Sequence, residues 1–384
     1  MKTNLKKKNI LIFGYHDINR DPRALRQIKW LSEFCDVSYI SQIPDSNLDA
    51  SFIRLEPLPK WERLLRNFLL VMRCYNKYSW SSMLKGVFNK VNPIRFDLVI
   101  VHHINLLPIA AKLENVDKII LDAHEYYPEV YDEAIVWRLL MKPYYAWLCR
   151  QYLNKCDLVI AVNESMQKRY SDDYLVNADF ITNAVDFEDQ YPRPVNSGEI
   201  KLLHHGLASP SRQLEKMIYI MDFTDFRFTL TFILLEINKT SSNYVTKLKK
   251  LAKNNPNIKF ETPVDMKDIV SLGNNYDIGL FFMPPTNYNE EYSLANKVFQ
   301  FVQSRLMLAF SPLPEMKKIV LNNNLGIVSE DFEPCSMAHK LNALKVEEIY
   351  SYKEQSHNNA LKLSSISNKN KFLTLVSNLI GYND

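Results

Sequence analysis

The sequence has few of the residues that mark a disulfide-bonded, metal-stabilised or membrane-spanning protein. Its five cysteines, Cys35, Cys74, Cys149, Cys156 and Cys335, form no C-x-x-C pair, so we expect neither disulfides nor a structural zinc site. No apolar run reaches the roughly 20 residues that a membrane-spanning helix needs. No D-x-D sequence marks a Mg²⁺ site. We therefore expect a protein without metal or other cofactor.

Glycine is also scarce, and the charge is nearly balanced. Eight glycines occur in 384 residues and none forms G-x-G-x-x-G, the usual dinucleotide fingerprint. The net charge of +4 does not by itself call for nucleic acid. The N-terminus, MKTNLKKKNILIFGY, is basic and then apolar, but it lacks a small-residue cleavage site and predicts a first strand. We expect a cytoplasmic chain.

What the sequence does contain is a regular alternation of apolar strands and amphipathic helices, enough for two domains at this length. Expected strands cover residues 9–15, 36–40, 51–57, 97–103, 118–124, 157–162 and 178–185, and then 201–206, 228–236, 257–263, 277–283, 306–311 and 325–330. Several are apolar on both faces, as in parallel sheets covered by helices on each side. This pattern predicts an α/β fold with two Rossmann-like, doubly wound domains.

The domain boundary is expected at the segment QYPRPVNSG, residues 190–198, which has a linker composition. The first domain then spans 1–190 and the second 191–365. A C-terminal helix, about 366–384, is a candidate to cross back onto the first domain. In open α/β sheets ligands sit beyond the carboxyl ends of the strands, so the residues after each strand are the candidates for a site.

The first candidate is HHGLASPSRQLEKMI, residues 204–218. Gly206 ends a strand, and Ser209-Pro210 predicts an N-cap followed by proline at the first helical position. Arg212 would then lie in the first helical turn, where backbone N–H groups and the helix dipole favour an anion such as a diphosphate. An ordinary capped helix with a solvated arginine explains the segment equally well.

The second candidate is EEYSLANKVFQFVQ, residues 290–303. Ser293 is expected to cap a helix that presents Asn296, Lys297 and Gln300 on one polar face. Such a face at a helix N-terminus suits a phosphate and a ribose. A solvated helix face is the alternative.

The third candidate is IILDAHEYYPEVYDE, residues 119–133. His124 follows an apolar strand, at the position where a β-sheet enzyme contacts its substrate. A lone histidine is more often a structural group, but three such sites at strand ends favour a functional interpretation.

Together these segments resemble the GT-B glycosyltransferases of sequence family 4. The resemblance covers about residues 9–330 in collinear order and rests on DPRALRQIKWL, LDAHEYYPE, KCDLVIAVNESMQKRY, FITNAVD, GLASPSRQLE and DIGLFFMPPTNYNEEYSLANKVFQFVQSRLMLAFSPLPEM. The last block follows the pattern D-x-G-L … L-P-N-K-x-F-E-Y-x-x-x-G-x-P-V almost throughout. The resemblance implies two domains facing across a cleft, with an acceptor in the first and a nucleotide-sugar donor in the second.

The resemblance also implies roles for individual residues. Arg212 and Lys297 would hold the donor diphosphate, Gln300 would face the ribose, and His124 would touch the transferred sugar, which makes His124, Arg212 and Lys297 the catalytic candidates. The donor-binding set is Gly206, Arg212, Val264, Glu291, Ser293, Asn296, Lys297 and Gln300. The cleft or acceptor set is Arg23, His103, Glu125 and Asn183.

The sequence departs from the family pattern at several of these positions. The family's ribose-binding glutamate is Gln300 here, and its second glutamate falls on Tyr292, beside Glu290 and Glu291. The glycine after the helix is replaced within Gln303-Ser304-Arg305. These departures leave open a non-catalytic GT-B partner subunit. A GT-B sugar-nucleotide epimerase is the other alternative, although it should carry more acidic groups and histidines around its cleft.

Residues 60–90 suggest where the acceptor comes from. They carry seven basic residues against one acid, Glu62, with apolar residues at helical spacing, a pattern typical of a helix at a membrane surface. The alternative is a helix whose apolar side covers the sheet. We expect a glycan or polyprenol-linked acceptor, transfer with retention as in the family, and peripheral association with an anionic membrane surface at the inner face of the plasma membrane.

Overall fold

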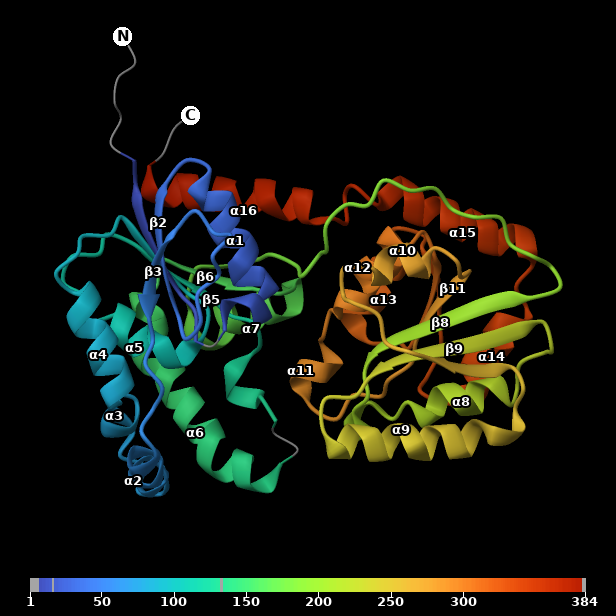
Figure 1. Ribbon diagram of the computed structural model, residues 1–384, viewed down its shortest axis with the longest axis horizontal. Coiled ribbons are helices and arrows are strands. Elements are labelled where there is room, and N and C mark those ends of the chain that lie inside the picture. Colours follow the sequence, from blue (N-terminus) through green and yellow to red (C-terminus); the bar gives the residue numbers. More distant parts are fainter. Residues whose placement is uncertain (1–6, 16, 132–133, 382–384) are drawn as a thin grey trace, which may run out of the picture. The chain divides into compact units, whose positions relative to one another are not determined.

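The computed structural model describes residues 7–15, 17–131 and 134–381, which form two compact units (Figure 1). Unit 1 comprises Met1–Thr182, Asn287–Asn289 and Lys369–Asp384, and unit 2 comprises Asn183–Thr286 and Glu290–Asn368. The division by compactness falls at Thr182, whereas the sequence places the boundary after residue 190.

Unit 1 is built on a parallel sheet in the order β3-β2-β1-β4-β5-β6-β7. Its strands are β1 (Asn9–Phe13), β2 (Asp36–Ser41), β3 (Ser51–Arg54), β4 (Leu98–Val101), β5 (Ile119–Asp122), β6 (Leu158–Ala161) and β7 (Ala178–Phe180). Every residue of β4 and β6 is buried, because helices cover both faces of the sheet.

The helices of unit 1 form two layers. They are α1 (Pro22–Ser32), α2 (Lys60–Val71), α3 (Tyr75–Tyr78), α4 (Ser82–Val91), α5 (Leu107–Ala110), α6 (Ile135–Tyr152), α7 (Glu164–Tyr174) and α16 (Ser365–Ile380). On one face α16 inserts Phe372 and Val376 into a core that also contains Ile28 of α1. On the other face α4 to α7 pack on the sheet. None of the described helices is both long and apolar enough to cross a membrane.

Unit 2 repeats this plan with a parallel sheet in the order β10-β9-β8-β11-β12-β13. Its strands are β8 (Ile200–Leu207), β9 (Phe228–Leu235), β10 (Ile258–Glu261), β11 (Ile278–Phe281), β12 (Met307–Phe310) and β13 (Gly326–Val328). Its helices are α8 (Glu215–Met221), α9 (Lys239–Leu251), α10 (Ile269–Gly273), α12 (Asn296–Gln303), α13 (Pro314–Asn322), α14 (Pro334–Asn342) and α15 (Val346–Asn359); the short α11 (Tyr288–Glu291) lies where the chain changes unit. The prediction of two doubly wound parallel sheets is confirmed.

The first part of the expected linker packs onto unit 2 through Arg305. This arginine is fully buried and has a left-handed backbone, with φ at 60°. Its guanidinium donates to the carbonyl oxygens of Glu188 at 2.5 Å and Gln190 at 3.0 Å. The Gln190 amide in turn donates to the Gln303 carbonyl oxygen at 2.6 Å. Arg305 therefore occupies a position where the family has glycine and uses its side chain to fix residues 188–190.

Candidate functional site

A cationic pair lies at the carboxyl end of β8 in unit 2. Gly206 has φ at 126°, a conformation that favours glycine. A Cβ built there would lie 2.7 Å from the Lys297 Nζ and 3.7 Å from the Arg212 Nη1. Glycine is thus required both for the backbone angle and for the space that the Lys297 ammonium takes up. Gly206 and Lys297 lie close together although they are 91 positions apart along the chain.

Lys297 is buried without a carboxylate to neutralise it. Among the described residues it forms no ion pair or hydrogen bond, and its Nζ lies 5.4 Å from the centre of the Phe281 ring. Burial, together with the nearby Arg212, lowers the pKa of Lys297 to about 7. An anion placed beside this ammonium would restore its charged form.

Arg212 faces the same space. Its Nη1 donates to the Leu207 carbonyl oxygen at 3.3 Å. Burial lowers its pKa, and the Glu290 carboxylate partly offsets that effect. A buried ammonium and a half-buried guanidinium with so little compensating charge are suited to a strong anion, and a diphosphate offers two charged groups.

Two histidines that the sequence analysis did not single out border this site. His204 and His205 precede Gly206 on β8, and the His204 Nδ1 lies 2.9 Å from the Leu280 carbonyl oxygen. Burial and the charge of Lys297 lower the pKa of His205 to about 3 and that of His204 well below its usual value. Both imidazoles therefore stay neutral. The run HHG directly before the expected site was the available signal.

The structure corrects the expected start of both helices. Ser209 does not cap an α-helix: Pro210–Arg212 form a single 3-10 turn, Gln213 adopts a left-handed conformation with φ at 46°, and α8 begins only at Glu215. Ser293 does not cap α12 either, because that helix begins at Asn296 after Ala295. Cap signals are local, and here the backbone turns once more before each helix begins.

The remaining donor candidates are scattered around the cationic pair. Gln300 lies one turn after Lys297, is buried, and its Nε2 contacts the Met266 Sδ at 3.4 Å. Asn296 is the exposed first residue of α12, and the Ser293 Oγ is enclosed without a hydrogen bond. Val264 and Glu291 are exposed, on the loop after β10 and at the end of α11. It is Glu290, not Glu291, whose charge acts on Arg212.

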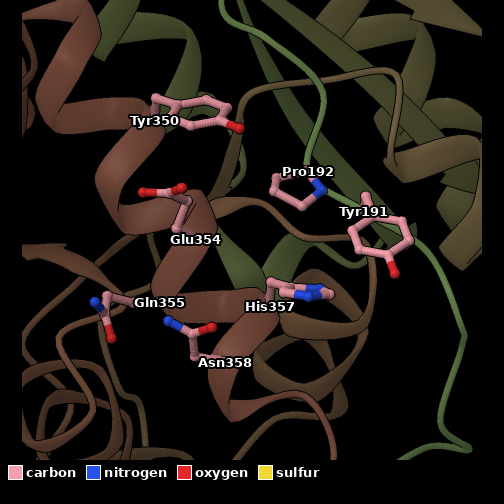
Figure 2. Close-up of a pocket in the computed structure, with 7 residues that line it drawn as sticks. All are labelled: Tyr191, Pro192, Tyr350, Glu354, Gln355, His357 and Asn358. Carbon is pink, nitrogen blue, oxygen red and sulfur yellow. The ribbon is translucent and has the colours of Figure 1, made fainter.

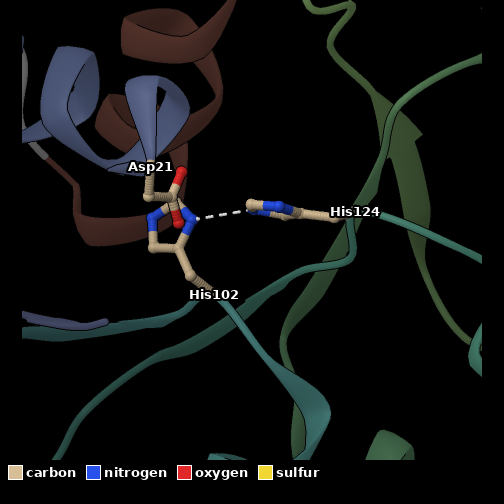
Figure 3. A group of neighbouring side chains, drawn as sticks. All are labelled: Asp21, His102 and His124. Carbon is tan, nitrogen blue, oxygen red and sulfur yellow. Dashed lines mark hydrogen bonds between the residues drawn. The ribbon is translucent and has the colours of Figure 1, made fainter. Parts of the chain in front are cut away.

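In unit 1, His124 is the outer member of a buried polar chain (Figure 3). Its Nε2 lies 3.2 Å from the Nδ1 of His102, so one ring donates to the other. The His102 Nδ1 is 4.0 Å from Asp122, the last residue of β5. Burial lowers the pKa of His124, which keeps this imidazole neutral. The arrangement fixes the ring plane of His124 at the carboxyl end of the sheet.

Arg23 binds Asp122, the innermost member of this polar group, rather than facing an acceptor. Its Nε donates to both carboxylate oxygens of Asp122 at 2.8 and 2.9 Å, and its Nη1 donates to the Ile181 carbonyl oxygen at 2.6 Å. Gln27 donates to the same carboxylate at 2.5 Å. Burial opposes ionisation of Asp122, but the Arg23 guanidinium beside it outweighs that effect and the pKa of Asp122 is lowered to about 2. The expected acceptor contact of Arg23 is therefore a structural ion pair.

The other three cleft candidates have different surroundings. The His103 Nδ1 accepts from the Asn105 backbone N–H at 3.2 Å, and its ring stacks on Tyr15 at 5.4 Å. Glu125 is half-buried, and burial raises the pKa of its carboxyl group. Asn183 is half-buried and is the first residue of unit 2. His102, Gln27 and Asp122 were not predicted, although His102 and Asp122 stand in the quoted strand segments.

A metal ion has one candidate position among the described residues. Asp21, His102 and His124 each offer a ligand atom, and these atoms lie within 4.8 Å of one another (Figure 3). However, the Asp21 carboxylate already accepts from the Ala24 backbone N–H at 3.1 Å and caps α1.

A separate pocket of 290 Å³ lies on unit 2 (Figure 2). It is lined by Tyr191, Pro192, Tyr350, Glu354, Gln355, His357 and Asn358. None of these residues belongs to the predicted donor set, and His357 accepts from the Arg305 Nε at 3.1 Å. The pocket thus adjoins residues 188–190, which Arg305 holds in place, rather than Lys297 and Arg212.

Comparison with known proteins bears on both units. Residues 35–189 match the family model for glycosyltransferase family 4. No curated protein sequence matches the chain. Among solved structures, a glycosyltransferase from Rickettsia africae has a TM-score of 0.73 at 14% identity, covering 98% of this chain and 100% of that one. HepE from Anabaena, solved with UDP and glucose, has a TM-score of 0.68 at 12% identity, covering 97% and 100%.

A third similar structure is longer than this protein. It is a mutant of S. aureus TarM, solved with fondaparinux, alpha-GlcNAc-glycerol and UDP, with a TM-score of 0.60 at 13% identity. The match covers 78% of this chain but only 59% of the TarM chain. At such identities the likeness shows the shared fold.

Proposed function

We propose that the protein is a family 4-like glycosyltransferase of the GT-B fold that moves a sugar from a UDP- or GDP-sugar to a glycan or polyprenol-linked acceptor. We place the donor diphosphate beside Lys297 and Arg212, the ribose near Gln300, and His124 near the transferred sugar. HepE and TarM were each solved with UDP, which supports this class of donor.

The observation that carries the proposal is the uncompensated charge of Lys297. A buried ammonium beside a half-buried guanidinium is unfavourable in the free protein, and burial together with Arg212 accordingly lowers the pKa of Lys297. The absence of a Cβ at Gly206 gives the Lys297 ammonium the space that it occupies. A bound diphosphate would remove this electrostatic cost, because it supplies the negative charge that the protein does not place beside Lys297.

The same two cations account for catalysis. As the bond between sugar and diphosphate breaks, negative charge grows on the leaving group and the sugar becomes oxocarbenium-like. Lys297 and Arg212, held in fixed positions away from water, stabilise that charge more strongly in the transition state than in the ground state. Transfer would then need no metal. Retention of configuration follows the family, and His124 would hydrogen-bond the sugar from a neutral imidazole.

A polyprenol-linked acceptor would place the reaction at the cytoplasmic face of a membrane. Support comes from α2, whose apolar side chains are exposed. The alternative, a helix whose apolar side covers the sheet, is supported by Leu70, which is buried in the core of unit 1, but not by the exposed apolar side chains.

The proposal is tested by measuring nucleotide binding and donor turnover together. Wild type, Arg212→Ala, Lys297→Met and the control Lys250→Met, which changes an exposed lysine on α9, are titrated with UDP and GDP. Each site variant should lose about 1.5–3 kcal/mol of binding free energy, the contribution of a charge-assisted hydrogen bond. Hydrolysis of a panel of UDP- and GDP-sugars then separates an enzyme from a non-catalytic subunit. If both site variants bind like Lys250→Met, the assigned donor site is wrong.

A further inference from the structure

Helix α2 faces the opposite way from an ordinary surface helix. Its one acid, Glu62, is buried, and the carboxylate accepts from the Ser82 backbone N–H at 2.8 Å and from the Ser82 hydroxyl. Leu70 is also buried, in the core of unit 1. Five other large apolar side chains of α2 are instead exposed, by 48% to 75%: Trp61, Leu64, Leu65, Phe68 and Val71. At 3.6 residues per turn these five occupy a stripe about 120° wide. A stripe of this kind normally packs on a core, but here it faces outward.

Helix α6 carries a second group of exposed apolar side chains. Ile135, Val136 and Leu139 in its first turns are 63% to 71% exposed, whereas Trp137 and Leu140 pack against the core of unit 1. Helices α2 and α6 contact each other, and both project from the same side of the sheet, at the bottom of the view in Figure 1. We call the exposed side chains of α2 and of residues 135–139 the apolar platform.

Exposed basic residues on and beside the two helices accompany the apolar platform: Lys60, Arg63, Arg73, Lys77 and Arg138. Helix α6 itself contains no acid and that of α2 is turned inward, while Asp132 and Glu133, which precede α6, lie outside the described residues. Arg66 is not available, because it donates to the Tyr78 carbonyl oxygen and its guanidinium stacks over the Tyr78 ring at 4.2 Å. Exposed apolar side chains beside basic residues are complementary to a surface with an apolar interior and a negatively charged outer layer.

We propose that the apolar platform inserts into the interface of an anionic lipid bilayer. Apolar side chains would enter the boundary between headgroups and acyl chains, and the basic residues would meet lipid phosphates. A second copy of the chain fits less well, since a two-fold contact would bring two sets of basic residues together. This inference extends the proposed function by giving a lipid-linked acceptor its location, but the surface itself does not depend on transferase activity.

The test is co-sedimentation with phosphatidylcholine vesicles that contain or lack phosphatidylglycerol. We compare wild type with Leu64→Ser/Phe68→Ser on α2, Ile135→Ser/Leu139→Ser on α6, and Arg63→Gln/Arg138→Gln among the basic residues. Phe226→Ser is the matched control, because Phe226 is an 88% exposed aromatic residue on unit 2. All the exchanged side chains are exposed, so the thermal midpoint and UDP affinity should match wild type.

Binding to anionic vesicles should fall at least tenfold in each apolar variant and be unchanged in the control. The Arg63→Gln/Arg138→Gln variant should lose about 25-fold, near fivefold for each basic residue, and salt above a few hundred millimolar should release the wild type. No vesicle binding, equal binding to neutral vesicles, or platform-dependent dimers that exclude vesicles would each overturn the proposal. Vesicle binding without nucleotide binding would instead refute the donor site and leave the platform standing.

Discussion

Nucleotide-sugar binding should take up a proton at Lys297. The free site holds the pKa of Lys297 at about 7, against an ordinary 10.5, and an adjacent diphosphate should return it toward the ordinary value. The complex then binds more protons than the free protein between these two values, so affinity is greatest at low pH and falls as the pH rises. For full recovery of the pKa, the Kd should increase about 50-fold from about pH 7 to about pH 9, or roughly 2.3 kcal/mol.

The assay is isothermal titration with the tightest-binding nucleotide sugar, whose diphosphate diester has no proton to lose in this range. Repeating it in two buffers of different ionisation enthalpy counts the protons, with an expected uptake of about 0.9 at about pH 8. Lys297→Met should bind weakly at every pH and take up none. An affinity that stays flat across the range, with no proton uptake by the wild type, would refute the assignment of Lys297 as a diphosphate ligand.

Three further substitutions test the two sites separately. Gly206→Ala should abolish nucleotide binding, measured by titration, because its Cβ would lie 2.7 Å from the Lys297 Nζ at a φ of 126°; unchanged affinity would show that Lys297 moves freely. His124→Ala should lower kcat far more than nucleotide affinity, and an equal loss in both would move His124 into the nucleotide pocket or the core. Gln300→Glu should keep activity in a donor-turnover assay and shift the pH dependence upward, because a carboxylate one turn from Lys297 raises the pKa of that lysine; a strong loss would show a site adapted to the amide.

The strands could be predicted because the feature that forms them, a short continuous run of apolar residues, is read directly from the local sequence. A parallel strand covered on both faces must be apolar throughout, as LVIV in β4 and LVIA in β6 are. The carboxyl ends of such strands point to one edge of the sheet, which made the segments containing Gly206 and Lys297 candidates for a site. That both belong to one donor site was implied by the resemblance.

What could not be predicted depends on partners far away in the sequence. Arg23 was expected to meet an acceptor, but its partner Asp122 lies 99 residues away and is fully buried. The orientation of α2 was equally hidden, since an amphipathic period is the same whether the apolar stripe faces a core or the exterior. The burial of Glu62 and Leu70, together with the exposure of the apolar stripe, shows which way that helix is turned.

Arg305 has a consequence for anyone who redesigns this protein by consensus. Restoring the family's glycine would relieve a left-handed backbone, a change that ordinarily stabilises a protein by a few tenths of a kcal/mol up to about 1 kcal/mol. It would also remove the guanidinium that donates to the carbonyl oxygens of Glu188 and Gln190 and leave a cavity in place of a fully buried side chain. Truncation of a large buried side chain ordinarily costs about 2–5 kcal/mol because of the cavity it leaves, so the loss exceeds the gain. A consensus design would change Arg305 to glycine first, yet Arg305 should be kept.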